Sequence, residues 1–209
     1  MKILLFPFEG NNMPNKALGK DAVPFVHTLP DTALLGSKRP FFIPDFAPVC
    51  RAHLHLAVRI CRLGRSISER FAHRYYDAMA PVVHFTAHPL LEQLQEAGRP
   101  WDVACGFDSS LSVGTFRTLP TVDRAADGAD EADAPSYVLR MNGRSMVQLP
   151  CAPSLKAVDA CIARVSQFYT LRQGDMLVLG QSETAPEVHI DDRLAVFEGP
   201  DEVLAFNVK

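Results

Sequence analysis

The sequence predicts an α+β fold that is rich in strands and has few helices. Between residues 52 and 62, apolar side chains alternate with histidine, alanine and arginine, which is the period of a strand with one buried face. The Asn142-Gly143 pair separates two strand-like runs, and this dipeptide strongly indicates a β-hairpin. The runs that read as strands in the last third are 137–141, 145–149, 176–179, 193–198 and 203–208.

Three stretches have the apolar spacing of helices. The first begins after Ser66, which forms a capping box with Glu69, and we expect it to continue to Met79 and stop before Pro81. The second is predicted at 89–97, and the third at 155–168, with an apolar stripe of Val158, Ile162, Val165 and Phe168.

We expect the 209 residues to form a single domain. A strand opens the chain at 1–6, and the rest of residues 1–50 reads as irregular, extended chain rich in Pro, Gly and Asn. A short apolar strand is expected at 82–86. Residues 123–134 are acidic and rich in Ala, and we expect them to form an exposed loop.

Charge and hydropathy exclude several classes of protein. The chain has 21 basic and 24 acidic residues, and no stretch clusters Lys and Arg as a nucleic-acid surface would require. The apolar run after Lys2 is too short for a signal peptide, and no later run approaches the length of a membrane span. Five widely spaced cysteines without a CxxC pair indicate reduced thiols rather than a disulfide framework. We therefore expect a cytoplasmic protein without nucleic-acid or membrane partners.

Four segments, taken together, resemble the fumarylacetoacetate hydrolase family. They are Lys38-Arg-Pro-Phe-Phe-Ile-Pro-Asp-Phe46, the strand and helix from Leu54 to Tyr76, the stretch from Phe85-Thr-Ala87 to Phe107-Asp108, and Leu171-Arg-Gln-Gly-Asp175 with the chain that follows. The resemblance implies a curled mixed sheet, or β-roll, around a pocket with a few flanking helices. It also implies a homodimer and a divalent metal that assists reactions of small 2-oxo or diketo acids.

The family's metal-binding carboxylates are replaced in this sequence. The family has a Glu-x-Glu pair on the first long strand, where this chain has His53 and His55. The family's third ligand, an aspartate, corresponds to His84 in His84-Phe-Thr-Ala-His88-Pro89. The family's lysine before Phe-Asp corresponds to Cys105, and its N-terminal catalytic histidine falls near residues 7–12, where no histidine stands.

Three neutral imidazoles would select a different metal from three carboxylates. Magnesium prefers oxygen ligands, so we expect it to lose most of its affinity through these exchanges. Three histidines match the ligand set of zinc and also suit iron, nickel or copper, so we expect zinc first among divalent transition metals at His53, His55 and His84. Such binding should weaken below about pH 6.5, where free imidazole takes up a proton. The alternative is that the three side chains are exposed or satisfied histidines without a metal.

Candidate catalytic and substrate-binding residues follow from the same alignment. Cys105 could supply a thiolate or a soft ligand, and His88 could line the pocket or cap a loop. Arg59 could bind a substrate carboxylate or could pair with Glu69 or Asp77. Further candidates for substrate binding, each with packing or loop capping as the alternative, are Trp101, Asp108 and Ser109.

Two hypotheses about function remain open. The first is an enzyme with a remodelled histidine site that hydrolyses a C–C bond in, decarboxylates or isomerises a small oxo acid. The second is a non-catalytic relative, or pseudoenzyme, that keeps the fold as a binding or assembly module. Metal content distinguishes them, because only the first requires a bound transition metal.

Overall fold

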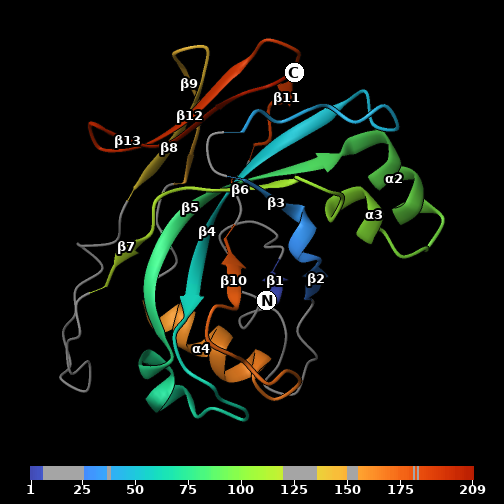
Figure 1. Ribbon diagram of the computed structural model, residues 1–209. Coiled ribbons are helices and arrows are strands. Elements are labelled where there is room, and N and C mark those ends of the chain that lie inside the picture. Colours follow the sequence, from blue (N-terminus) through green and yellow to red (C-terminus); the bar gives the residue numbers. More distant parts are fainter. Residues whose placement is uncertain (7–25, 37–38, 120–135, 150–154, 181, 183) are drawn as a thin grey trace.

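The computed structural model describes residues 1–6, 26–36, 39–119, 136–149, 155–180, 182 and 184–209. Within that part of the chain the protein is built from two sheets with a few flanking helices (Figure 1). This confirms the predicted strand-rich α+β class. Residues 7–12 and the acidic segment 123–134 lie outside the described residues.

The larger sheet is mixed and curls around a concave face. In the described residues its continuous path runs β2-β1-β10-β4-β5-β6-β3, while β11 pairs with β4 and β7 pairs with β5. Its strands are β1 (Ile3–Leu5), β2 (His27–Leu29), β3 (Leu34–Leu35), β4 (Cys50–Ile60), β5 (Tyr76–Ala87), β6 (Leu111–Val113), β7 (Arg117–Thr118), β10 (Met176–Leu179) and β11 (Glu187–Val188).

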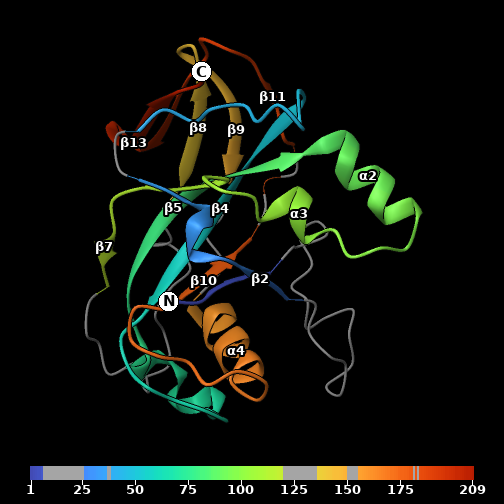
Figure 2. The same ribbon diagram turned by 45° about the vertical axis from the view of Figure 1, so that its right-hand side comes forward.

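The smaller sheet lies at the end of the molecule that holds the C-terminus (Figures 1 and 2). Its order is β13-β12-β8-β9, from strands β8 (Tyr137–Met141), β9 (Arg144–Leu149), β12 (Arg193–Glu198) and β13 (Asp201–Asn207). Asn142 and Gly143 join β8 to β9 with φ values of 53° and 78°, so the predicted hairpin is confirmed together with its left-handed turn residues.

Strands β4 and β5 form a long antiparallel pair whose side chains contribute to the cores on both faces of the larger sheet. The alternation of β4 sends Leu54, Leu56 and Val58 into the main core, which also includes Val158 and Ile162 of α4 (Leu155–Val165). The other face of β4 carries Ala57, which packs with Val82 of β5, Leu5 and Met176 in a second, smaller core. That second core lines the concave face and leaves the histidines of β4 and β5 beside it.

The first predicted helix is wrong over most of its length. The segment contains only a 3-10 helix, η2 (Glu69–Arg74), and β5 begins at Tyr76, within the predicted helix. The pairing of Tyr76 to Ala80 with β4 satisfies backbone groups that a helix would have had to satisfy alone. Ser66 adopts φ 51°, outside the extended region of a helix cap, and the capping residue is Ser68 without a side-chain bond.

The other helices agree better with the sequence. Helix α2 (His88–Glu96) matches the predicted 89–97, while α4 ends at Val165 and leaves Phe168 half exposed instead of on the buried stripe. The segment predicted as irregular contains β2, β3 and a short 3-10 helix, η1 (Asp31–Ala33). A further short helix, α3 (Asp102–Cys105), precedes β6. In the described residues, no helix combines the length and apolar character needed to cross a membrane.

Asp175 links β1 and β10, two neighbouring strands of the larger sheet. Its buried carboxylate accepts hydrogen bonds from the backbone N–H groups of Lys2 (2.8 Å) and Arg172 (2.8 Å), and the Lys2 ammonium lies 2.6 Å from Oδ2. Burial alone would raise the pKa of Asp175, but these donors outweigh it and lower that pKa. The carboxylate thereby holds β1 beside β10.

Replacing Asp175 with Asn should lower the free energy of unfolding by about 2–4 kcal/mol, because three donors lose a charged acceptor that is largely removed from water. Urea unfolding at pH 7 measures the loss. The matched control is Asp191→Asn, which removes an exposed ion pair with Lys209 and should change stability by less than about 0.5 kcal/mol. Equal effects of the two substitutions would contradict the role given to Asp175.

Candidate functional site

Three histidines gather on the concave side of β4 and β5. The strand register places His53 directly opposite His84, and His55 follows two residues along the same face of β4. The ring centroids are 6.1 Å apart for His53 and His55, 6.3 Å for His53 and His84, and 5.5 Å for His55 and His84. The predicted convergence of these three side chains on one face is therefore present in the structure.

Each imidazole has a neutral hydrogen-bond partner. His84 donates from Nε2 to the Cys105 carbonyl at 2.6 Å, and His55 donates from Nδ1 to the Gly180 carbonyl at the end of β10. His53 Nε2 lies 3.1 Å from the Thr86 hydroxyl. Because carbonyls can only accept, the first two bonds fix the tautomers and leave Nδ1 of His84 and Nε2 of His55 as the nitrogens with lone pairs.

Burial keeps all three imidazoles uncharged at neutral pH. Desolvation, followed by the charges of His84, His88 and Arg51, lowers the pKa of His53 to about 3. Desolvation is also the main cause that lowers the pKa of His84 to about 4 and the pKa of His55 well below its usual range. The site therefore presents unprotonated nitrogen ligands, which is the state that metal binding requires.

One ring nitrogen of the site has no protein partner in the described residues. Nε2 of His55 is buried and makes no hydrogen bond there, although buried polar atoms are normally satisfied. As the side chains stand, no three His, Cys, Asp or Glu groups in the described part of the chain surround a common point closely enough to hold a metal ion. The arrangement thus supplies neutral donors and one unsatisfied lone pair, and ring rotation would be needed to complete a ligand set.

Cys105 contributes through its backbone rather than as a thiolate. The side chain is buried, and desolvation, together with the charge of Asp102, raises the pKa of the thiol to about 12. A thiol with that pKa is protonated at neutral pH and is a weak nucleophile. The Cys105 carbonyl instead accepts hydrogen bonds from His84 and from the Ser110 hydroxyl.

Arg59 is engaged with a carboxylate at the far end of β4. It donates from Nε and Nη2 to the two oxygens of Asp77 at 2.8 and 2.9 Å, and it lies over the Phe116 ring. Four residues of strand separate it from His55, a distance of about 13 Å. Of the two alternatives for Arg59, the structure shows the ion pair with Asp77.

The remaining predicted residues lie around the rim. His88 opens α2 and contacts Glu92 at 3.1 Å, and its charge acts on His53. Asp108 is exposed, and Ser109 has a left-handed φ of 64° with its N–H bonded to the Thr32 carbonyl. Trp101 packs against His27, with ring centroids 3.9 Å apart.

Sequence reasoning missed two groups near the site. His27 is not among the candidate site residues that the sequence indicates, and it is buried on β2 with its Nδ1 3.5 Å from the Asp102 carboxylate. Arg51 lies two residues before His53, on the same face of β4, and its charge lowers the pKa of His53. The alternation that singled out His53 and His55 was placed at residues 52–62, and the strand extends it back to Arg51, whereas nothing in the sequence links His27 to residues 101–105.

Comparison with known proteins identifies the family of this chain. The model of the family described as fumarylacetoacetate (FAA) hydrolase C-terminal matches residues 9–204. The chain belongs to this family. The oxaloacetate tautomerase YcgM of Escherichia coli K12 is 28% identical over 178 residues, which cover 84% of this chain and 78% of that protein.

Solved structures of FAA hydrolase relatives share the fold. A putative fumarylpyruvate hydrolase from Burkholderia cenocepacia aligns with a TM-score of 0.78 and 25% identity over 100% of this chain and 88% of that one. The fumarylpyruvate hydrolase of Pseudomonas aeruginosa, in complex with Mn²⁺ and pyruvate, aligns with a TM-score of 0.76 and 20% identity over 100% of this chain and 89% of that one. These matches confirm the curled mixed sheet expected for an FAA hydrolase relative.

The histidine site of this family member does not fit a hard cation. Magnesium and similar ions prefer carboxylate and carbonyl oxygen, and here the three facing side chains are neutral imidazoles. Neutral imidazoles whose second ring N–H is donated to a backbone carbonyl have the chemistry of ligands for a late divalent ion, although as they stand the three described rings do not surround a common point. The orphaned Nε2 of His55 is the observation that favours such an ion.

Replacing His84 with Gln should flatten the pH dependence of stability. Because the pKa of His84 is lowered to about 4, the unfolded chain binds its proton first as pH falls below about 6.5, and stability is lost between these two values. Because of His84, the free energy of unfolding of the wild-type protein should be about 2 kcal/mol lower at pH 5 than at pH 7.5. Urea unfolding at both pH values measures the difference, and an unchanged pH dependence in H84Q would contradict a buried neutral His84.

Proposed function

We propose that this chain is an isomerase that interconverts the keto and enol forms of a small 2-oxo acid on the concave face of its larger sheet. The observation that carries the proposal is the group of three buried, neutral imidazoles on β4 and β5. Tautomerisation moves a proton and requires no protein nucleophile, which suits a site whose nearby thiol has a raised pKa. The resemblance to an oxaloacetate tautomerase supports this choice over hydrolysis or decarboxylation.

We further infer that His53, His55 and His84 would hold a late divalent ion, with zinc the first to test. When bound, such an ion polarises the carbonyl of an oxo acid and stabilises its enolate. The Mn²⁺ in complex with the Pseudomonas enzyme supports a bound divalent metal, and the imidazoles of this chain support a softer ion. The lowered pKa values also move the pH at which metal binding should weaken. The sequence suggested about pH 6.5, whereas these imidazoles stay neutral well below that pH.

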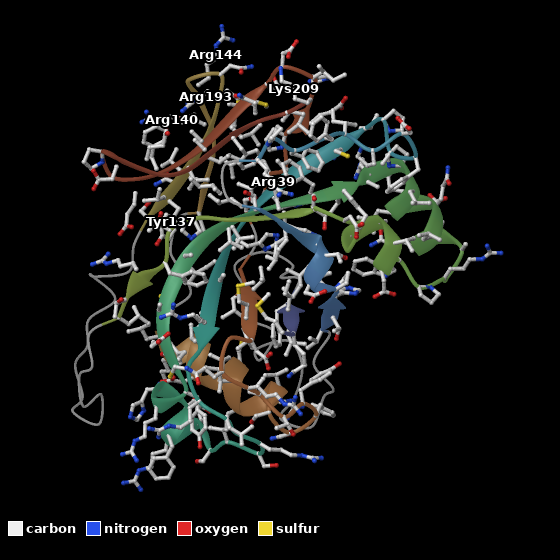
Figure 3. The ribbon with its side chains drawn as sticks, viewed as in Figure 1. Arg39, Tyr137, Arg140, Arg144, Arg193 and Lys209 are labelled. Atoms are coloured by element: carbon white, nitrogen blue, oxygen red, sulfur yellow. The ribbon has the colours of Figure 1, made fainter. Side chains whose placement is uncertain are left out.

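Arg51 is the cation that we assign to the substrate carboxylate, in place of Arg59. It stands on the face of β4 that carries His53, about 7 Å along the strand, and no ion pair engages it in the described residues. Figure 3 shows Arg140, Arg144 and Arg193 on the smaller sheet, where Arg193 pairs with Glu202. Neutral imidazoles beside one guanidinium give the pocket the sign of charge that attracts an anion.

A non-catalytic FAA hydrolase relative is the second candidate. The hydrogen bonds of His53 and His84 favour it, because each of these rings already contacts a protein group and the rings do not converge on one point as they stand. Such a protein would bind an oxo acid without converting it.

The first test is activity with zinc added to metal-free protein. We expect the wild-type protein to accelerate the loss of enol absorbance of oxaloacetate, and the His53→Ala/His55→Ala double variant to lose at least about 100-fold in kcat because the ligand set is broken. His189→Ala is the matched control, since that side chain is 70% exposed and pairs with Glu187. If calorimetry shows no zinc binding and the wild-type protein shows no turnover, the second candidate replaces the first.

The second test separates the two arginines of β4. Arg51→Gln should raise KM for the oxo acid about 10-fold or more and change kcat less, because a charge-assisted contact to the substrate carboxylate is lost. Arg59→Gln should leave KM within about twofold, since its partner is Asp77. Steady-state kinetics at constant ionic strength measure both, and the reverse order of effects would restore the assignment to Arg59.

A further inference from the structure

His27 lies on the same concave face as the three site histidines. In the pairing of β1 with β2, His27 stands opposite Leu5, and Leu5 packs with Ala57 and Val82 in the second core. Side chains opposite each other in a sheet share a face, and Ala57 follows His55 by two residues. Two strands, β1 and β10, lie between β2 and β4 in the sheet, and its curl turns β2 toward the face of β4 that carries the histidines.

A carboxylate and an indole hold the His27 ring from α3. This helix contacts both β2 and β5, and Figure 2 shows it beside the end of β5. Asp102 Oδ1 lies 3.5 Å from His27 Nδ1, and the Trp101 ring packs at 3.9 Å with an interplanar angle of 57°. An acceptor at Nδ1 keeps the proton on that nitrogen and leaves the lone pair on Nε2.

The charged and titratable groups that face His27 come from two elements. Asp102 of α3 acts directly on it, and His84 of β5 is close enough for a charge on His27 to lower its pKa, while β1 presents the apolar Leu5. Desolvation lowers the pKa of His27, and the hydrogen bond and charge of Asp102 oppose that change. His27 lies beside a carboxylate, whereas the hydrogen bonds of His55 and His84 go to backbone carbonyls.

We propose that His27, oriented by Asp102, is the group that transfers the proton in the keto–enol step. This inference rests on the proposed function. His27 Nε2 takes a proton from the carbon next to the carbonyl, and the electron pair of that C–H bond becomes the C=C bond of the enolate. The protonated His27 then gives this proton to the enolate oxygen, which yields the enol and returns His27 to its neutral form. The reverse sequence returns the ketone, so the step needs no oxidant, reductant or second substrate.

The other histidines are poorer candidates for this proton transfer. A general base works best when its pKa lies near the working pH. The pKa of His53 is lowered to about 3 and that of His84 to about 4, and their partners are the Thr86 hydroxyl and the Cys105 carbonyl rather than a carboxylate. Their nitrogens are also assigned to the metal.

The experiment compares wild-type protein with His27→Asn, Asp102→Asn and Asp102→Glu, each loaded with zinc. His27→Asn should lower kcat by about 100-fold or more, and should slow exchange of the oxo acid's methylene protons with deuterated water, because the base is gone. Asp102→Asn should lower kcat and move the acidic limb of the pH profile to lower pH, since the carboxylate that raises the pKa of His27 is lost. Asp102→Glu should restore part of both.

Two readouts do not depend on turnover. The NMR titration of the His27 ring should shift to lower pH in Asp102→Asn, and zinc affinity by calorimetry should stay within about twofold of wild type in His27→Asn. An active wild-type protein with an equally active His27→Asn variant would overturn the His27 assignment alone. A His27 titration unaffected by Asp102→Asn would overturn it too, whereas an inactive wild-type protein would overturn both this inference and the proposed function.

Discussion

The antiparallel pairing of β4 with β5 is the constraint on which the rest of the structure depends. The register of these two strands puts His53 opposite His84, and the period of two gives the same strands an apolar face that enters the main core. A slip of one residue would exchange the two faces and bury the histidines in the main core. The packing of Leu54 and Leu56 thus fixes the position of the site as firmly as any contact within it.

Exchange of carboxylates for imidazoles changes how the pocket is kept stable as well as what it binds. Three carboxylates facing one another repel unless a cation neutralises them, whereas three neutral imidazoles can be buried together with only backbone and hydroxyl partners. The fold around this site therefore does not require a cation in order to form. In the described residues no ion pair engages Arg51, and its charge acts on His53.

The sequence was most informative where one local pattern decides the outcome. The alternation of residues 52–60 and the Asn142-Gly143 turn each predicted an element that the structure confirms. The prediction from sequence failed at Tyr76 to Met79, where the aromatic and alanine residues fit a helix as well as a strand. Pairing with the partner strand at 50–60 decides in favour of the strand. His27 and Asp102 could not be joined from sequence either, since their contact depends on how far the sheet curls.

The parallel pairing of β1 with β10 has a consequence for synthesis of the protein. The backbone N–H of Lys2 bonds a carboxylate 173 residues further along the chain, and the Gly180 carbonyl that orients His55 comes directly after β10. A growing chain on the ribosome can pair β4 with β5 early, but it cannot close the wall of the pocket until residue 180 has left the exit tunnel. Contacts of such long sequence separation form slowly. The histidines of β4 and β5 therefore spend the period of translation on an open hairpin, accessible to water and to any metal ion in the surrounding solution.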